Sequence, residues 1–251
     1  MTVGSAEFVR KVEELIPLVA QTGRSGVRSA ADLIYRCISD GGVVQTFGTG
    51  HSEALAMEIT ARAGGLVPTN RLALRDLVTF GGRPPEDLAD PLLERDPGVA
   101  QEVFDLAAPK PEDVFVIASN SGANGSVVEM ARIAKRNGNP LIAITSVAHS
   151  SAVESRHASG QKLVDLADVV LDNHAPYGDA ILTTPDGVPV CGVSSITAAL
   201  LAQMIVADVV ATMIEAGDQP PVYLSANIPG GHERNTVLEA RYAGRIRRVG
   251  A

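Results

Sequence analysis

The sequence predicts an α/β protein in which a parallel sheet carries helices on both faces. The main observation is a repeated order along the chain: a short apolar strand, a small polar turn and then a helix. This order is clearest over residues 113–118, 119–125 and 126–136, and another strand pattern follows at 141–144. Strands that alternate with helices in this way form parallel sheets, because each crossover helix packs back onto a face of the sheet.

The first forty residues are expected to be helical. Their apolar residues recur every three to four positions, the spacing of one helix face: Phe8, Val12, Leu15, Ile16 and Val19. The pattern continues over residues 27–38, after a break marked by Gly23 and Gly26. We therefore expect N-terminal helices within residues 4–40 that are interrupted at these glycines.

A change of period after residue 40 marks the beginning of the sheet. Val43, Val44 and Phe47 form a short apolar run that ends at the turn of residues 48–50. Residues 52–62 have the pattern of a helix, and residues 66–74 have that of a strand. Residues 84–97 form a polar, proline-rich connection and are the best candidate for a mobile loop.

The second half of the chain continues the alternation. Strands are expected at 113–118, 141–144 and 169–171, and a helix at 126–136 ends before Pro140. The longest apolar run, residues 196–214, is nearly long enough to cross a bilayer, but Gln203 and Asp208 interrupt it. An Asp in mid-span costs about 2.5–3.5 kcal/mol. We therefore expect a core or interface helix and no membrane association.

The composition excludes several classes of protein. The 251 residues include 29 acidic and 21 basic ones, which gives a net charge of −8 and argues against a nucleic-acid partner. Cys37 and Cys191 form no CxxC motif and the five histidines show no metal-ligand spacing, so no disulfide framework and no metal are expected. The first residues carry no export signal, which predicts a cytoplasmic protein.

Two predicted strand exits carry the residue types of an anion site. The first, residues 48–53, begins like a dinucleotide-binding turn, but Glu53 stands where GxGxxG needs its third glycine, and no GK[ST] is present. No cofactor is therefore expected, and a single phosphate held by Ser52 and a helix N-terminus fits better. The second exit brings Ser119, Ser121 and free backbone N–H groups to the beginning of a helix. Ordinary capped turns are the alternative for both.

Two further strand exits carry weaker signals. Residues 145–151 contain a cluster of hydroxyl groups, including Thr145 and Ser150, which is equally consistent with helix capping. Residues 172–179 bring His174 to a strand end, a natural position for a group that transfers a proton. A purely structural histidine is the alternative at this position.

Together these loops resemble those of the sugar isomerase (SIS) domain family. The resemblance is carried by GTGHSEA at 48–54, VIASNSGANGSVVEMA at 116–131 and IAITS at 142–146. SRHASGQKL at 155–163 and LDNHAPYGDA at 171–180 are similar to an uncharacterised single-domain branch, which is related to phosphoheptose isomerase and N-acetylmuramic acid 6-phosphate etherase.

This resemblance implies a doubly wound, flavodoxin-like sheet of five parallel strands and a sugar phosphate as the ligand. It implies one SIS domain over residues 1–251, with the core at about 43–214, helices at 4–40 and a C-terminal extension at 215–251. It also implies a set of side chains that contact the phosphate: Ser52, Ser119, Ser121, Asn124, Thr145 and Ser150. At the position of Asn124 many relatives carry Ser or Thr.

The catalytic residues carry over less completely. Phosphoheptose isomerases have paired glutamates in the first helix of the core, where this chain offers Glu58 and then Arg62. Their histidine on a late helix has no counterpart in residues 193–197. The chemistry of these relatives therefore does not transfer to this chain as a whole.

An aldose–ketose isomerase needs a base for the proton beside the carbonyl group and an acid for the oxygen. His51 and Glu58 are seven residues apart, so on one helix they would share a face. We expect Glu58 as the base with His51 or His174 assisting, whereas the alternative for Glu58 is an exposed ion pair with Arg62. His232, in a loop at 229–235, is a further acid/base candidate, and the resemblance to the SIS family implies that this loop could complete the site of a neighbouring subunit.

Three functions remain open at this point. The first is a phosphosugar isomerase that acts through an enediolate, the second an etherase-like lyase, and the third a non-catalytic phosphosugar sensor or regulatory protein. The apolar run at 196–214 favours a homodimer or homotetramer, and the resemblance implies sites near the subunit interface. Arg245, Arg247 and Arg248 form a short basic tail that is expected to be a solvated end or a contact between subunits.

Overall fold

The computed structural model describes residues 3–247 and confirms the predicted α/β architecture. Five parallel strands form the main sheet in the order β2-β1-β3-β4-β5. Their bounds are Val44–Gly48 (β1), Thr69–Leu72 (β2), Val114–Ala118 (β3), Leu141–Thr145 (β4) and Val169–Asp172 (β5). In this flavodoxin-like order the chain changes direction across the sheet between β1 and β3, and such switch points are where ligands bind in open α/β sheets.

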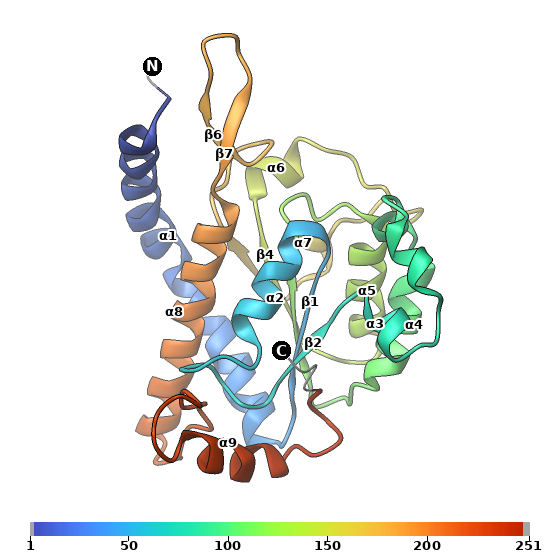
Figure 1. Cartoon of the computed structure of the whole chain (residues 1–251), viewed down its shortest axis with the longest axis vertical. Coiled ribbons are helices and arrows are strands. Elements are labelled where there is room, and N and C mark those ends of the chain that lie inside the picture. The colour runs from blue at the N-terminus through green and yellow to red at the C-terminus, as the bar shows by residue number, and fades with distance from the viewer. Residues whose placement is uncertain (1–2, 248–251) are drawn as a thin grey trace.

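Strand β3 illustrates how the sheet divides the interior into two cores. Val114, Val116 and Ala118 lie in the core beneath α1 (Ser5–Ser39) and α8 (Ser194–Glu215). Phe115 and Ile117 lie in the other core, beneath α4 (Gly98–Ala107) and α5 (Gly125–Arg136). Successive side chains of a strand point to opposite faces, so a strand covered on both sides is apolar throughout. Figure 1 shows α1 and α8 on one side of the sheet and α4 and α5 on the other.

The predicted break at Gly23 and Gly26 is wrong, because α1 runs without interruption through both residues. A Cβ atom on Gly23 would lie 2.9 Å from Cδ2 of Leu201 in α8, and one on Gly26 would lie 2.7 Å from Cδ2 of Leu171 in β5. The two glycines therefore allow α1 to pack closely on its neighbours. These contacts outweigh the low helix propensity that made the glycines resemble a helix end.

Helix α8 is the one helix within residues 3–247 that is long and apolar enough, by length and composition, to cross a membrane. In this fold it packs along α1, and many of its residues belong to the core: Ala198, Leu201, Ala202, Ile205, Val206, Val209 and Met213. The expected core helix at 196–214 is confirmed for this face. Ile196 and Ile214, near its two ends, are exposed.

The remaining elements are short, and several differ from the predictions. Helix α2 (Glu53–Ile59) ends earlier than expected, since Thr60 is extended and Ala61 has a φ of 54°. The connection at 84–97 contains the 3₁₀ turns η2 (Pro85–Ala89) and η3 (Leu93–Arg95). Strands β6 (Ala180–Thr183) and β7 (Pro189–Gly192) form an unpredicted hairpin that extends beyond the sheet (Figure 1). Three further short helices are α3 (Asp76–Thr79), α6 (Val147–Ser151) and α7 (Leu163–Leu166).

The basic residues near the C-terminus bind to the chain itself, so the expected solvated end is wrong for Arg245 and Arg247. Nη2 of Arg245 lies 2.5 Å from Oδ1 of the fully buried Asp113, and Nη1 of Arg247 lies 3.6 Å from Oδ2 of Asp76. Burial raises the pKa of Asp76 and lowers that of Arg247. Both residues follow α9 (Gly231–Ala240): Arg245 joins the C-terminal segment to the beginning of β3, and Arg247 joins it to Asp76 in α3. Arg248 lies outside the described residues.

Candidate functional site

The loops that leave β1 and β3 meet at the switch point of the sheet and border two adjoining cavities. One cavity, of about 190 Å³, lies between α2 and the start of α8, and we call it the helical cavity. The other, of about 410 Å³, is lined by the loops after β1, β3 and β4, and we call it the loop cavity. Four residues line both cavities: His51, Ser52, Ser119 and Asn120. The two cavities are therefore neighbouring parts of one depression.

The exit of β3 forms a tight turn on the wall of the loop cavity. Gly122 has a φ of 61°, and a Cβ atom there would lie 3.1 Å from Cβ of Leu163, so glycine is required for both backbone and space. The Gly122 N–H group donates to Ser119 Oγ over 3.1 Å, and the Ala123 N–H group donates to Ser121 Oγ over 3.3 Å. Each hydroxyl accepts one of these bonds and can donate its own hydrogen to a ligand.

Helix α5 begins at the same wall. Its N-cap residue, Asn124, makes no side-chain cap bond, and its Oδ1 accepts instead from Nη1 of Arg156 over 2.8 Å. The first N–H groups of a helix have no partner within the helix and carry the positive end of its dipole. The loop cavity thus combines two serine hydroxyls with a helix N-terminus, which suits a bound anion.

Four of the six predicted phosphate ligands line the loop cavity: Ser52, Ser119, Ser121 and Asn124. Thr145 and Ser150 do not line it. Thr145 is buried and donates to the carbonyl groups of Ser119 and Asn120 over 2.6 and 3.1 Å, so it holds the exit of β3 against β4. Ser150 is also buried, and its hydroxyl has no hydrogen-bond partner among the described residues.

Glu58 and His51 both line the helical cavity. Nε2 of Gln203 in α8 donates to Oε1 of Glu58 over 2.9 Å, and Arg62 pairs with the same oxygen. The ion pair that the spacing suggested is therefore present, although Arg62 lies beyond the end of α2. His51 belongs to the 3₁₀ turn η1 (Gly50–Ser52), so the argument from one shared helix face is wrong even though both side chains reach the cavity.

The structure does not bring His174 or His232 to either cavity. Nε2 of His174 lies 2.7 Å from Oγ1 of Thr22 in α1, and its Nδ1 lies 3.4 Å from Oδ2 of Asp172. His232 is exposed near the beginning of α9, which Figure 1 shows at the opposite end of the molecule from the hairpin β6–β7. The expected loop at 229–235 is wrong from Gly231 onward, where α9 begins.

Several polar residues that line the depression were missed by sequence reasoning. Nδ2 of Asn173 donates to Oδ1 of Asn120 over 2.8 Å, and this pair joins the exits of β5 and β3 beneath the helical cavity. His149 lines the loop cavity and packs edge-on against Tyr177 with 5.1 Å between ring centres. The two asparagines lie within two residues of strand ends, which is a detectable signal. Arg156 lies in an irregular segment, and only the folded chain brings it to Asn124.

Comparisons with known proteins agree with this geometry. Residues 7–146 match the SIS domain family. A UPF0309 protein of Listeria monocytogenes is 39% identical over 241 residues, which cover 95% of this chain and 97% of that protein. A UPF0309 protein of Geobacillus kaustophilus is 36% identical over 241 residues, which cover 96% of this chain and 94% of that protein.

Solved structures with the same fold include two phosphoheptose isomerases. The protein GmhA from Neisseria gonorrhoeae superposes with a TM-score of 0.54 at 18% identity, over 82% of this chain and 96% of that one. The protein from Francisella tularensis has the same TM-score of 0.54 and 18% identity, over 82% of this chain and 98% of that one. At these identities the likeness concerns the fold alone. The match over residues 7–146 and the relatives that align along almost their whole length decide the family: this chain belongs to the SIS domain family and, within it, to the UPF0309 proteins.

Proposed function

We propose that this protein binds a sugar phosphate and interconverts its aldose and ketose forms. The phosphate would occupy the loop cavity and the sugar the helical cavity. The observation that carries this proposal is the adjacency of the two cavities. Ser52 and Ser119 line both of them, and Glu58 lines the helical cavity. Membership of the SIS family supports a sugar phosphate as the ligand, and the fold shared with two phosphoheptose isomerases is consistent with it.

In the proposed reaction Glu58 removes the proton from C2 of the aldose. The electrons of that C–H bond form a double bond between C1 and C2, and the carbonyl oxygen at C1 takes up the negative charge, which gives an enediolate. Glu58 then returns the proton to C1, while His51 moves the other proton between the two oxygens, so that the overall change is an isomerisation. Both interactions of Glu58 involve Oε1, which leaves Oε2 as the oxygen that accepts the proton. Gln203 holds the carboxylate in position from α8.

One experiment separates this proposal from its alternatives. The protein is incubated in D₂O with a panel of ketose, aldose and amino-sugar 6- and 7-phosphates, and the sugars are followed by NMR. Exchange between aldose and ketose with deuterium incorporated at the abstracted position supports the isomerase. Release of lactate from an ether-linked substrate would indicate a lyase. Saturable shifts without either change would identify a phosphosugar sensor, and no binding at all would refute the phosphate site.

Two variants test the roles of the cavities. Glu58→Gln keeps the shape of the side chain and should abolish turnover, because the base is lost, while the protein still binds the sugar phosphate. The variant also loses the ion pair between Oε1 of Glu58 and Arg62. Glu154→Gln, at an exposed position outside both cavities, removes the same charge and serves as its control. Turnover that survives in Glu58→Gln would remove Glu58 from the mechanism.

Ser121→Ala tests the loop cavity separately. The variant should lower the affinity for phosphorylated sugars by roughly tenfold, since a hydrogen bond to a charged group contributes about 1.5–3 kcal/mol. The affinity for unphosphorylated sugars should stay unchanged. An equal loss for both kinds of sugar would contradict the assignment of the phosphate to this cavity.

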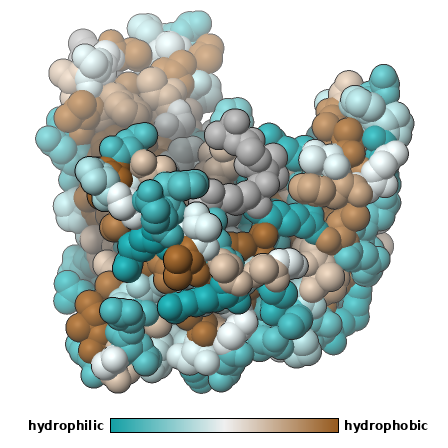
Figure 2. All heavy atoms as spheres, turned by 60° about the horizontal axis from the view of Figure 1, so that its bottom comes forward, coloured by the Kyte–Doolittle hydropathy of each residue, from teal (hydrophilic) through white to brown (hydrophobic). Residues whose placement is uncertain are grey.

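We also propose that the chain forms a homodimer or homotetramer through the surface of α1 and α8. Exposed apolar side chains lie on both helices: Val9 and Leu18 on α1, and Ile196 and Ile214 on α8. On the face that carries α9, by contrast, apolar residues are interspersed with hydrophilic ones (Figure 2). Sedimentation of the wild type and of Leu18→Glu/Ile214→Glu tests this surface, and a monomeric wild type would refute it. Since His232 on α9 lies away from both cavities of its own chain, any role in catalysis would require it to reach the site of another subunit.

A further inference from the structure

We propose that Arg156 is the cationic ligand of the phosphate in the loop cavity and selects a doubly charged phosphomonoester. This inference rests on the phosphate site proposed above. Arg156 is the one Lys or Arg among the described residues that line this cavity. Its Nη1 donates to Oδ1 of Asn124 over 2.8 Å, so its guanidinium lies at the beginning of α5 and on the same wall as Ser121.

The backbone of Arg156 is joined directly to the turn that would hold the phosphate. The Arg156 N–H group donates to the carbonyl group of Ala123 over 2.9 Å. The Leu163 N–H group, at the end of the same segment, donates to the carbonyl group of Gly122, also over 2.9 Å. Arg156 is therefore held beside the serine turn before a ligand arrives, and binding needs little additional ordering of the backbone.

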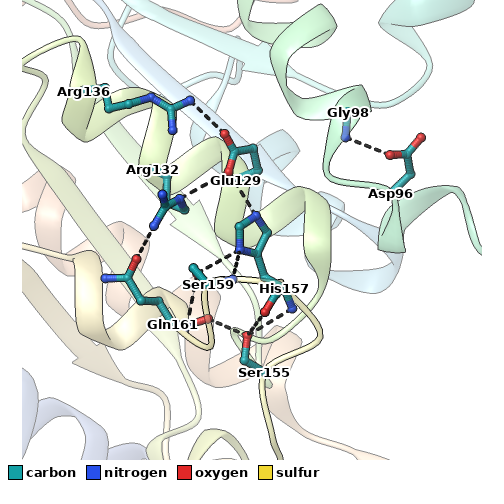
Figure 3. Close-up of polar contacts among 9 residues, drawn as sticks. All are labelled: Asp96, Gly98, Glu129, Arg132, Arg136, Ser155, His157, Ser159 and Gln161. Carbon is teal, nitrogen blue, oxygen red and sulfur yellow. Dashed lines mark hydrogen bonds and ion pairs between the residues drawn. The ribbon is translucent and has the colours of Figure 1, made fainter.

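The residues after Arg156 fasten the segment to α5, as Figure 3 shows. Nε2 of His157 lies 3.0 Å from Oε2 of Glu129, and the Ser159 N–H group donates to Nδ1 of His157 over 3.1 Å. Because Nδ1 is an acceptor, Nε2 carries the proton that is donated to Glu129. Arg132 of α5 also donates to the side chain of Gln161. The segment that carries Arg156 is thus anchored both to the serine turn and to the helix that begins there.

The hydrogen bond to Asn124 leaves most of the guanidinium free. A guanidinium has five N–H donors in a planar fork, and the bond to Asn124 involves one of its terminal nitrogens. The remaining donors match the spacing of two phosphate oxygens. Glu94 also lines the loop cavity: its carbonyl group accepts from Ser126 Oγ in the first turn of α5 over 2.6 Å, while its carboxylate is directed toward the exit of β1, with Oε2 3.5 Å from where a Cβ atom of Gly50 would stand. Arg156 adjoins the exit of β3, where the serine hydroxyls are.

A positive charge at this position favours one class of ligand. A phosphomonoester carries a charge of about −1.5 to −2 near pH 7, because its second pKa is about 6. A sulfate ester has the same tetrahedral shape and a single negative charge. Neutral hydroxyl and N–H donors distinguish the two only weakly, whereas a guanidinium interacts more strongly with the dianion. The ligand class that Arg156 predicts is therefore a phosphomonoester rather than a sulfate ester.

The test compares Arg156→Gln and Arg156→Lys with the wild type by isothermal titration calorimetry. The probes are the sugar 6- or 7-phosphate of the panel that binds the wild type most tightly and the sulfate ester of the same sugar. Arg156→Gln should lower the affinity for the sugar phosphate by about tenfold or more and the affinity for the sulfate ester by about threefold or less. Arg156→Lys keeps the charge but not the fork and should lie between the wild type and Arg156→Gln. Arg28→Gln, at an exposed position on α1, is the control for net charge.

The pH dependence provides a second measurement. Between about pH 5 and 7 the ligand loses its second proton, so the difference in phosphate affinity between the wild type and Arg156→Gln should widen as the pH rises. His51, His149 and Glu94 also line the loop cavity, but they are common to both proteins, so the comparison isolates the contribution of Arg156. Unchanged phosphate affinity in Arg156→Gln, or an equal loss for phosphate and sulfate, would overturn the role of Arg156 and leave the proposed function standing. If the wild type binds no sugar phosphate, the proposed function fails and this inference fails with it. If Arg156→Gln does not fold, Arg156→Lys decides by its ratio of phosphate to sulfate affinity.

Discussion

Replacing Arg245 with Ala removes the one charged donor that a buried carboxylate has within residues 3–247. Asp113 is fully buried, and its Oδ1 accepts from the Val43 N–H group over 2.9 Å and from Nη2 of Arg245 over 2.5 Å. Its Oδ2 accepts from Nε2 of Gln45 over 2.8 Å and from the Lys110 N–H group over 3.0 Å. In Arg245→Ala the carboxylate keeps three neutral donors but loses the positive charge among these four.

The size of the effect follows from this arrangement. Two opposite charges about 4 Å apart interact by about 4 kcal/mol at an effective dielectric constant of 20, and breaking a buried ion pair costs about 3–5 kcal/mol. The three remaining hydrogen bonds and the 18% exposure of the Arg245 side chain, which admits water in its place, reduce this cost. We expect a loss of about 2–3 kcal/mol in the free energy of unfolding and a fall of roughly 5–10 °C in Tm.

Urea unfolding monitored by circular dichroism measures this loss. Arg234→Ala, at an exposed position on α9, is the matched control and should change the free energy of unfolding by less than about 0.5 kcal/mol. In a double-mutant cycle with Asp113→Asn, the cost of Arg245→Ala should fall below about 1 kcal/mol, because the buried charge is gone. A loss under about 0.5 kcal/mol in the wild-type background, or the same loss in both backgrounds, would refute the reasoning.

Three further predictions concern packing, titration and the support of the site. Gly26→Val should lower the free energy of unfolding, measured in urea, by about 2 kcal/mol, because even a Cβ atom at this position would lie 2.7 Å from Cδ2 of Leu171. Ser25→Val, at an exposed position, is the control, and an equal effect of both substitutions would contradict the close approach. Burial raises the pKa of Cys37 from 9.0 to about 12, so the unfolded chain loses this proton first and stability should decline between pH 9 and 12. The contribution is up to about 1.4 kcal/mol per pH unit, and Cys37→Ala should make the decline correspondingly shallower; an identical slope in both proteins would exclude this cause. Thr145→Val should weaken sugar-phosphate binding about tenfold, measured by isothermal titration calorimetry. Thr145 lines neither cavity, but its two hydrogen bonds hold the exit of β3 in place, so unchanged affinity would contradict this role.

The strands and their exits could be predicted because local patterns encode them. The apolar run before Ser119 and the polar turn after it indicate where β3 ends, whatever the rest of the chain does. The carboxyl ends of parallel strands lie at one edge of a sheet, so Ser52 and Ser119 could be expected to meet once the strand order was known. Their shared position between the two cavities follows from the same rule.

Elements that depend on distant contacts were predicted less well. Gly23 and Gly26 resemble a helix end in sequence, but Leu201 and Leu171 approach them in the fold and the helix continues. The cluster of basic residues in the C-terminal segment predicts a solvent-exposed end, whereas Arg245 forms an ion pair with a buried carboxylate 132 residues away in the sequence. In both cases the energy of a tertiary contact exceeds the local preference that the sequence pattern reports.

By itself the sequence determined the α/β class, the positions of the main strands and the serine-rich turns at their ends. These features follow from periods of two and 3.6 residues and from turn chemistry, which act over a few neighbouring residues. Only the tertiary structure decided which distant side chains meet. In the folded chain the side chain of His174 is hydrogen-bonded to that of Thr22, Gln203 is hydrogen-bonded to Glu58 across 145 residues, and Arg156 is hydrogen-bonded to Asn124 across 32 residues. Such pairs form when the sheet closes and its helices pack, and the outcome depends on the sum of many contacts rather than on any local pattern.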